Sequence, residues 1–260
     1  SELLRLLAEE GWEPERLDRL AALSAQAIDA MKPPVSEPPG PLRELQDRWE
    51  QSLAGDPDYS VYDHDDYLAE LWGCWVVYSR TYLQTIARAG SFPPLGLQRI
   101  LTPAGRIVDL GCGCGFSTAI LAELFPGSDV HGTNLPDTIQ TRVAVKLGAR
   151  YGFEVHAEPA AVPGTGGLVF ASEYFERFPA PVDHLHEILD ALDPDRLLVA
   201  NTFTAPAIGH FPSYLIDGAP TDGKATNRAF NAALKARGYR KVPTKMWNQR
   251  PTLWARDQEI

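Results

Sequence analysis

The stretch RIVDLGCGCGF, Arg106 to Phe116, is an apolar run followed at once by three glycines and two cysteines. Such a segment can be interpreted as a metal site, a redox pair or a nucleotide-binding turn. A zinc site on Cys112 and Cys114 would lack further ligands at a usable spacing, and a redox pair usually has two intervening residues where this one has one. We therefore expect no metal here and interpret both cysteines as small side chains that fill a tight turn.

The glycines point instead to a bound ligand. A strand that turns directly into a helix needs residues without a Cβ atom wherever a ligand approaches the backbone closely. The glycines are Gly111, Gly113 and Gly115, and Phe116 occupies the third position of the dinucleotide fingerprint Gly-x-Gly-x-x-Gly, which disfavours NAD. Asp109 suits a cationic ligand better than a pyrophosphate. The segment thus predicts a nucleotide-like ligand with an ammonium or sulfonium group.

From Arg106 onward, short apolar runs alternate with helical stretches, which is typical of a largely parallel β/α sheet. We expect strands at residues 106–110, 128–133, 153–156, 167–171 and 196–201. We expect helices between them at about 116–125, 137–150 and 182–192. After the irregular segment TFTAPAIGHFPSYLIDGAP, the chain has a helix over DGKATNRAFNAALKARG and two strands, in YRKVPTKMW and PTLWARD. These two strands are close enough to pair as an antiparallel hairpin with NQR in its turn.

Residues 1 to about 100 are expected to be mostly helical. Apolar residues recur there at three- and four-residue steps in SELLRLLAEE, ERLDRLAALSAQAIDAM and DDYLAELWGCWVVYSRTYLQTIARAG. The proline-rich segment KPPVSEPPGP, residues 32–41, is interpreted as a stiff linker, and SFPPLG, residues 91–96, closes the helical region.

The segment VDLGCGCG, residues 108–115, resembles motif I of the class I S-adenosylmethionine-dependent methyltransferases, with its acidic residue, spacer and alternating glycines. The resemblance covers about residues 100–257. It implies an α/β fold with a Rossmann-like, seven-stranded, mostly parallel sheet whose last strand is antiparallel, here with an N-terminal helical cap. It also implies S-adenosylmethionine as the cofactor. We therefore predict a helical cap and substrate-covering region at residues 1–100, and an S-adenosylmethionine-binding methyltransferase domain at 101–260.

The resemblance assigns the first cofactor contacts. In the family the glycine loop lies along the methionine part and the ribose, and the acidic residue helps to organise that loop and the amino group. These roles fall on Asp109, Gly111, Gly113 and Gly115. The second strand normally ends in an acidic residue that binds both ribose hydroxyls, and Asn134 stands there instead. The alternative is that Asn134 only suits the geometry of a turn.

Two later segments match the family pattern as well. In HAEPAAVPG, Glu158 and Pro163 have the spacing of an acidic residue at the adenine amino group and a following proline; the alternative is a solvated loop carboxylate. LVFASEYFERFPAPVDHLHEIL resembles the segment above the active site, with Ser172, Glu173 and Glu176 at matching positions. We assign Ser172 to cofactor binding and the two glutamates to catalysis.

Methyl transfer is an in-line displacement at a sulfonium carbon, so the protein has to position a nucleophile and, where needed, remove its proton. Arg177 stands where many small-molecule members of the family carry a histidine base. The loop after the fifth strand supplies His210, our preferred general base, although a lone loop histidine is more often structural. We expect substrate contacts from Tyr59, Tyr62 and Tyr214, because aromatic side chains can line a pocket for a ring-bearing acceptor. Simple core packing is the alternative for such aromatic residues.

Composition and charge limit the partners. The chain of 260 residues is 44% hydrophobic and 22% charged, as is usual for a globular protein. Its net charge of −10 repels a phosphate backbone, so we expect no nucleic-acid substrate. No apolar run approaches the about 20 residues of a membrane span, the N-terminus lacks the pattern of a secretory signal, and three cysteines fit a reducing cell. We expect a cytoplasmic protein without a membrane partner.

The expected function is an S-adenosylmethionine-dependent methyltransferase that acts on a small molecule. A specialised metabolite is the leading candidate, methylated on oxygen, nitrogen or carbon. The tetrapeptide Asn/Asp-Pro-Pro-Tyr/Phe of amino-methylating DNA enzymes is absent, since ASEY stands at its place. The alternatives are a methyltransferase acting on a protein or tRNA side chain and a non-catalytic relative that only binds the cofactor. The expected partners are a small-molecule acceptor and, as a further candidate, a second copy of the chain in a homodimer.

Overall fold

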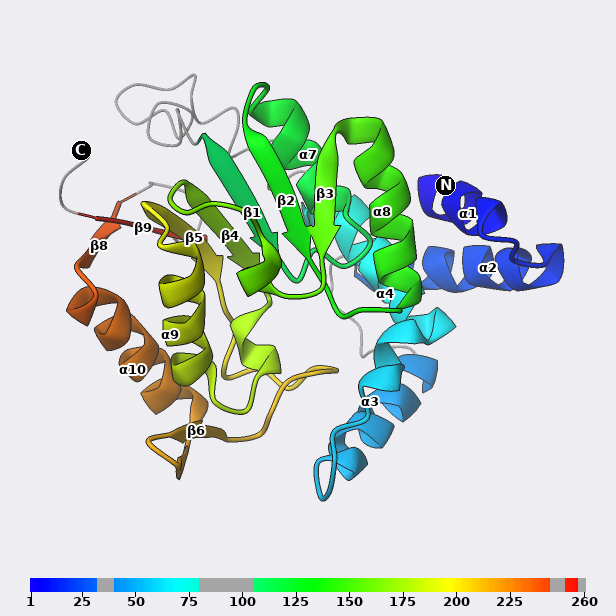
Figure 1. Ribbon diagram of the computed structural model, residues 1–260. Coiled ribbons are helices and arrows are strands. Elements are labelled where there is room, and N and C mark those ends of the chain that lie inside the picture. Colours follow the sequence, from blue (N-terminus) through cyan, green and yellow to red (C-terminus); the bar gives the residue numbers. More distant parts are fainter. Residues whose placement is uncertain (32–39, 80–104, 244–250, 257–260) are drawn as a thin grey trace.

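The centre of the protein is a mixed β-sheet (Figure 1). The computed structural model describes residues 1–31, 40–79, 105–243 and 251–256. The sheet consists of β1 (Arg106–Leu110), β2 (Asp129–Thr133), β3 (Phe153–His156), β4 (Leu168–Ser172), β5 (Arg196–Ala200), β8 (Tyr239–Val242) and β9 (Thr252–Arg256). Its order is β3-β2-β1-β4-β5-β9-β8.

The first five strands are parallel, and β9 runs antiparallel to both of its neighbours. The expected α/β fold, with a Rossmann-like, mostly parallel seven-stranded sheet and an antiparallel last strand, is confirmed. The hairpin of β8 and β9 is confirmed too, while its expected NQR turn lies outside the described residues. In the register, Asp109 pairs with Gly132 of β2 and Phe170 of β4, so the ends of these strands meet at one edge.

Helices cover both faces of the sheet. Between the strands lie α7 (Phe116–Leu124), α8 (Ile139–Tyr151), α9 (Pro181–Leu192) and α10 (Gly223–Ala236). Successive strand residues point to opposite faces: Ile107 packs into the cluster that contains α7 and α8, and Val108 into the cluster that contains α9 and α10. The carboxyl ends of the strands are left to loops, which is where open α/β sheets bind ligands.

The N-terminal region is helical, as expected. It contains α1 (Glu2–Glu9), α2 (Pro14–Ala30), α3 (Gly40–Ser52), the short η1 (Tyr59–Asp63), α4 (Asp65–Cys74) and a π-helical turn, η2 (Trp75–Ser79). Leu3, Leu6 and Leu7 of α1 are buried in the same cluster as Val143 and Leu147 of α8. The N-terminal helices and the sheet therefore share one hydrophobic core.

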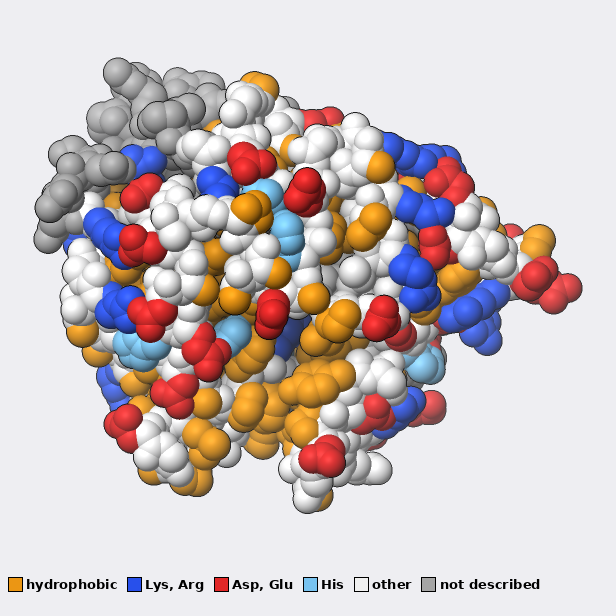
Figure 2. Space-filling view, in the orientation of Figure 1, with side chains coloured by type: hydrophobic (Ala, Val, Ile, Leu, Met, Phe, Trp, Pro, Cys, Tyr) orange, Lys and Arg blue, Asp and Glu red, His pale blue; other side chains and the backbone are white. Residues whose placement is uncertain are grey.

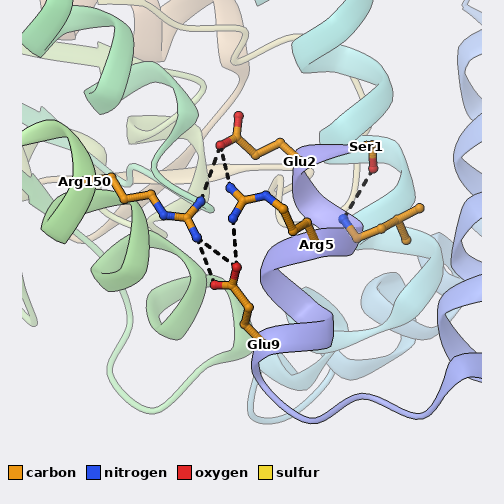
Figure 3. A network of polar contacts seen from close by, with 6 residues as sticks. Ser1, Glu2, Arg5, Glu9 and Arg150 are labelled. Atoms are coloured by element: carbon orange, nitrogen blue, oxygen red, sulfur yellow. Dashed lines mark hydrogen bonds and ion pairs between the residues drawn. The ribbon is translucent and has the colours of Figure 1, made fainter.

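Ion pairs surround this contact at the surface. Figure 3 shows Arg150 of α8 reaching Glu9 of α1 at 2.9 Å and Glu2 at 3.7 Å, while Arg5 pairs with the same two carboxylates. The Ser1 hydroxyl accepts a hydrogen bond from Leu4 N at 3.3 Å and caps α1. Exposed pairs of this kind contribute little, typically about 0–1 kcal/mol each, so α1 is held mainly by its leucines.

The segment α3–η1 forms a separate apolar cluster with the loop after β5. Trp49, Tyr62 and Tyr67 pack there with Ile208, and Trp49 Nε1 donates to His210 O at 2.8 Å. The N-terminal helices thus reach the carboxyl ends of the strands. Among the described residues, no helix is long and apolar enough to cross a bilayer.

Three local predictions need correction. Residues 40 and 41 begin α3 and are not part of a linker. The helix expected over residues 65–90 changes to a π-helical turn at Trp75, and its remainder, with SFPPLG, lies outside the described residues. The segment expected to be irregular contains a hairpin of β6 (Tyr214–Ile216) and β7 (Ala219–Thr221).

Candidate functional site

The three glycines after β1 all adopt left-handed backbone conformations, with φ of +64°, +55° and +82° at Gly111, Gly113 and Gly115. A Cβ atom at Gly111 would lie 2.6 Å from the Tyr174 ring, and one at Gly115 would lie 3.0 Å from the backbone of α8. At Gly113 the nearest atom is Oε1 of Gln140, at 3.3 Å. Gly111 and Gly115 are therefore required by packing, whereas Gly113 borders open space on most sides.

Asp109 lies beneath this loop. Its side chain is 2% exposed, and Oδ2 accepts hydrogen bonds from Ser117 Oγ at 2.6 Å and Thr118 Oγ1 at 2.7 Å. Burial raises the pKa of Asp109 to about 6, against the opposing effect of the two hydroxyls. The carboxylate joins the end of β1 to the first turn of α7 and so fixes the shape of the glycine loop.

The two cysteines of the loop are buried. Cys112 N donates to Thr133 O at 2.9 Å, which ties the loop to β2. Burial raises the pKa of both thiols, that of Cys114 to about 12. Neither thiol is poised to act as a thiolate nucleophile.

Asn134 stands at the end of β2 and contacts the glycine loop. Its Nδ2 donates to Gly113 O at 2.8 Å, and its Oδ1 accepts from Leu135 N at 2.9 Å. Ser172 ends β4 on the other side of β1, half-buried. Glu158 follows β3; its side chain is exposed and makes no capping hydrogen bond to η4 (Pro159–Ala161). The structure therefore gathers Asn134 and the glycine loop, and leaves Glu158 further out.

Glu173, Glu176 and His210 come together beyond β4 and β5, with one ligand-type atom from each within 4.8 Å of the others. Glu176 is fully buried; its Oε1 accepts from Thr202 N at 2.6 Å, while Oε2 has no hydrogen-bond partner among the described residues. Burial and the negative charge of Glu173 raise the pKa of Glu176 to about 8. The Glu176 carboxyl is therefore largely protonated near neutral pH.

His210 has a defined orientation in this group. Its Nδ1 lies 2.9 Å from Ala205 O, a carbonyl that can only accept, so Nδ1 carries a proton. Nε2 lies 3.8 Å from Glu173 Oε2. Burial and the positive charge of Arg177 lower the pKa of His210. A neutral imidazole with its Nε2 lone pair beside a carboxylate is the form that can accept a proton.

From the sequence, Arg177 is notable only because it replaces a histidine that many family members carry. In the structure it connects η5 (Phe175–Arg177), η1 and the loop after β5. It ends η5; Nη1 donates to Ile208 O at 3.0 Å and to the Tyr62 hydroxyl at 3.2 Å, and Nε donates to Glu173 O at 2.7 Å. A Cβ atom on Gly209 would collide with both the Tyr62 hydroxyl and Nη1. None of the contacts among the described residues engages Nη2.

The three tyrosines assigned to the substrate lie in different surroundings. Tyr62 is buried, and the centre of its ring lies 5.4 Å from the guanidinium carbon of Arg177. Tyr214 is buried behind Glu176, to whose backbone oxygen its hydroxyl donates at 3.3 Å. Tyr59 is 41% exposed and lies near Trp49. Figure 2 shows apolar side chains around a hollow on the face below the strand ends, between the β6 hairpin and α3.

His184 is not the helix-surface residue that its position on α9 suggests. Its ring stacks on Phe178 with centres 3.8 Å apart, and Nε2 lies 2.9 Å from the Tyr174 hydroxyl. Because the Tyr174 ring borders Gly111, this contact supports the glycine loop from below. No local sequence pattern marks such a contact.

Comparison with known proteins gives related sequences over part of the chain. No protein-family model matches it. It is 34% identical over 143 residues to trans-aconitate 2-methyltransferase of Sinorhizobium fredii, covering 54% of this chain and 52% of that protein. It is 29% identical over 94 residues to the protein of the same name from Rhodopseudomonas palustris strain HaA2, covering 36% and 37%. The chain thus matches about half of the first relative's length and about a third of the second's.

Solved structures resemble the whole fold. An O-methyltransferase family protein from Burkholderia thailandensis has a TM-score of 0.54 at 15% identity, covering 96% of this chain and 86% of that one. The amino pentose methyltransferase CalS10 of Micromonospora echinaspora, with S-adenosylmethionine bound, has a TM-score of 0.50 at 14% identity, covering 72% and 94%. The chain therefore has the fold of the class I S-adenosylmethionine-dependent methyltransferases, and over about half of its length its sequence is similar to a protein named as a methyltransferase.

Proposed function

We propose that the protein is an S-adenosylmethionine-dependent methyltransferase that acts on a small-molecule acceptor. The observation that carries this proposal is the turn after β1, where Gly113 has a left-handed backbone and little beside the place of its missing Cβ atom. A ligand lying against the main chain explains why that position is glycine. The relatives named as methyltransferases support the same activity.

The surrounding residues fit such a cofactor. The main chain of residues 111–115 would hold its methionine part and ribose. The amide of Asn134 already bonds to Gly113 O and Leu135 N, but Oδ1 can accept and Nδ2 can donate one further hydrogen bond, enough for a ribose hydroxyl. Glu158 is exposed and free to turn toward an adenine amino group. When bound, S-adenosylmethionine supplies an electrophilic methyl group.

His210 and the two glutamates would handle the proton of the acceptor. His210 offers its Nε2 lone pair, which lies 3.8 Å from Glu173 Oε2, and one oxygen of Glu176 lies within 4.8 Å of the other two groups. A proton taken by His210 would be stabilised by the adjacent carboxylate, as charge next to an imidazolium favours its charged form. We keep His210 as the preferred base and assign the carboxyl pair to orientation and proton storage.

We further propose that the acceptor carries a carboxylate. Arg177 is half-buried, and its Nε and Nη1 donate to three acceptors, while Nη2 makes no hydrogen bond to another of the described residues. A guanidinium held in this way suits a carboxylate, which it can bind with directed hydrogen bonds. The name of the relatives supports this class, because trans-aconitate is a carboxylic acid anion.

The remaining expectations form part of the proposal. Residues 1–100 would cover the acceptor, since Tyr62 of this region meets Arg177 of the 101–260 region. A reducing compartment such as the cytoplasm is supported by the three free cysteines. Contact with a second copy in a homodimer stays a prediction.

Cofactor binding is tested by comparing Gly113→Ala with Gly127→Ala. Both glycines have positive φ, +55° at Gly113 and +91° at Gly127, and neither Cβ atom would meet protein backbone or an aromatic ring within 4 Å, so the control carries at least as much backbone strain as the test variant. We expect calorimetry with S-adenosylhomocysteine to show binding for the parent and Gly127→Ala and no detectable binding for Gly113→Ala. The expected reason is that the new methyl group occupies space used by the cofactor.

The same measurement separates the alternatives. Equal affinity in Gly113→Ala would remove the ligand from this loop. Binding without release of S-adenosylhomocysteine from any acceptor offered, small acids, proteins and tRNA included, would favour the non-catalytic relative. Turnover with a protein or tRNA alone would favour the macromolecular alternative.

The acceptor class is tested with Arg177→Gln and trans-aconitate as the probe. Hydrogen bonds to charged groups contribute about 1.5–3 kcal/mol, so KM should rise by about 10-fold or more, while cofactor affinity stays close to that of the parent. Arg228→Gln, on the exposed side of α10, is the control and should behave as the parent. An uncharged amide of the probe should lose affinity for the parent and be indifferent to Arg177→Gln. An unchanged KM for the acid in Arg177→Gln would exclude this role.

A further inference from the structure

A second cluster of chemically reactive side chains lies on the sheet, along β2 and β3. It consists of His131 on β2 and Glu154 and His156 on β3, and Asp129 precedes His131 by two residues. Because side chains alternate along a strand and His131 pairs with Glu154 in the register, all four point to the same face. Val130 and Phe153 point to the opposite face, into the cluster of α7 and α8.

This face is open to solvent at its edge. β3 is the outer strand of the sheet. In Figure 1 none of the helices formed by the described residues lies in front of β2 and β3, and Figure 2 shows histidine side chains with carboxylates beside them on that face. His131 is buried, whereas the His156 side chain is 15% exposed. An ion from solvent can reach the histidine pair from the side of β3.

The donor atoms have the separations of metal ligands. His131 Nδ1 and His156 Nε2 are 3.1 Å apart, and Glu154 Oε2 is 3.8 Å from the same His156 nitrogen. Two imidazole nitrogens bound to one tetrahedral zinc ion at about 2.0–2.1 Å lie about 3.3 Å from each other. The histidines therefore need only a small adjustment, and the exposed Glu154 side chain is free to make a larger one.

Asp129 supplies the contact that metal-binding histidines usually have behind them. Its Oδ2 is 2.9 Å from His131 Nε2, away from the ideal direction of a hydrogen bond but close enough to keep the proton on that nitrogen. With Nε2 protonated, the Nδ1 lone pair of His131 is directed at His156. A simple hydrogen bond between the two imidazoles would also use that lone pair, but it gives no role to Glu154.

Charge distinguishes this cluster from the group of Glu173, Glu176 and His210. In that group Arg177 lies close enough to lower the pKa of His210, and His210 Nδ1 is used by a carbonyl. Near Asp129 the facing cation is Arg106, and its guanidinium is held by three carbonyl oxygens, those of Pro163, Gly166 and Leu192.

We propose that His131, Glu154 and His156 form a binding site for a divalent transition metal of the zinc class, with Asp129 orienting His131 and water completing the coordination. Two imidazoles and one carboxylate suit zinc, cobalt, nickel or copper, and do not suit magnesium or calcium, which prefer oxygen ligands. The site borders Asn134, whose backbone N donates to His156 O at 3.0 Å, but the proposal does not depend on the proposed methyl transfer.

The test uses the full chain, freed of metal with a chelator and then of the chelator, with no cofactor added. Calorimetry with Zn²⁺ should show one equivalent bound, and Co²⁺ should give the visible absorption of a tetrahedral site. His156→Gln is the main variant, because His156 is at the edge strand and partly exposed. It should weaken Zn²⁺ binding by at least about 10-fold, and Asp129→Asn, which removes the supporting contact, by about 10- to 100-fold.

His186→Gln, on α9 and away from this cluster, is the matched control and should bind as the parent does. The proposal is overturned if the parent binds no stoichiometric Zn²⁺, if His156→Gln binds it as tightly as the parent, or if His186→Gln loses as much. Equal binding of Mg²⁺ and Zn²⁺ would overturn the assigned metal class. None of these outcomes involves S-adenosylhomocysteine, so failure here leaves the proposed function untouched.

Discussion

At the scale of single residues, the candidate site depends on polar groups held in unusual states. Glu173 has a φ of +53°, an unfavourable conformation for a residue with a Cβ atom, and it places a carboxylate beside the buried Glu176. Glu176 keeps one oxygen bonded to Thr202 N and the other without a partner. Such strain and incomplete bonding reduce stability and are typical of functional positions.

The pKa of Glu176 predicts a pH dependence of stability. Its folded pKa of about 8 exceeds the ordinary 4.5, so between these values the folded state keeps a proton that the unfolded state releases. The free energy of unfolding therefore falls as pH rises, by up to about 1.4 kcal/mol per pH unit. Asp109, with a pKa of about 6, also makes the free energy of unfolding fall as pH rises, but only at lower pH.

Glu176→Gln should flatten this dependence between about pH 7 and pH 8. Histidines with lowered pKa values, among them His210, are neutral in the folded state throughout that interval. Urea unfolding at several pH values measures the slope, and Glu123→Gln, exposed on α7, is the control that should keep the slope of the parent. A variant slope equal to that of the parent would show that Glu176 is ionised at neutral pH.

At the scale of elements, predictions succeeded where one local pattern determines the structure. The run of apolar residues in β1, the glycines with positive φ and the start of α7 at Phe116 all follow from residues adjacent in sequence. α3 was missed because Pro41 was interpreted as part of a linker. Proline in the first turn of a helix costs nothing, because that turn has no partner for the missing N–H.

Other features depend on contacts that no local pattern contains. The hairpin of β6 and β7 has only three residues in each strand; Leu215 N is bonded to Pro179 O at 2.7 Å, and Tyr214 is buried between distant elements. Arg177 meets Tyr62 across 115 positions of sequence. The role of the arginine at the candidate site becomes visible only when the loop after β5 and the N-terminal helices are placed together.

At the scale of the whole molecule, the shared core predicts that the N-terminal helices and the sheet unfold together. Leu6 is fully buried in a cluster that includes residues of α4, α8 and all seven strands of the sheet. A core without a boundary at residue 100 favours one cooperative transition, because loss of either part exposes the apolar surface of the other.

Leu6→Ala provides the test. Removing a buried leucine side chain usually costs about 2–5 kcal/mol, and here the loss should appear equally in two probes during urea unfolding. Tryptophan fluorescence reports mainly on the N-terminal region, which contains Trp12, Trp49, Trp72 and Trp75 of the six tryptophans, while far-UV circular dichroism reports on all elements.

Val145→Ala, on α8 and 53% exposed, is the matched control and should stay within about 0.5 kcal/mol of the parent. Were Leu6→Ala to shift the fluorescence transition alone, the N-terminal helices would be a cap that unfolds independently of the sheet, and the contact of Tyr62 with Arg177 would then be adjustable by the acceptor.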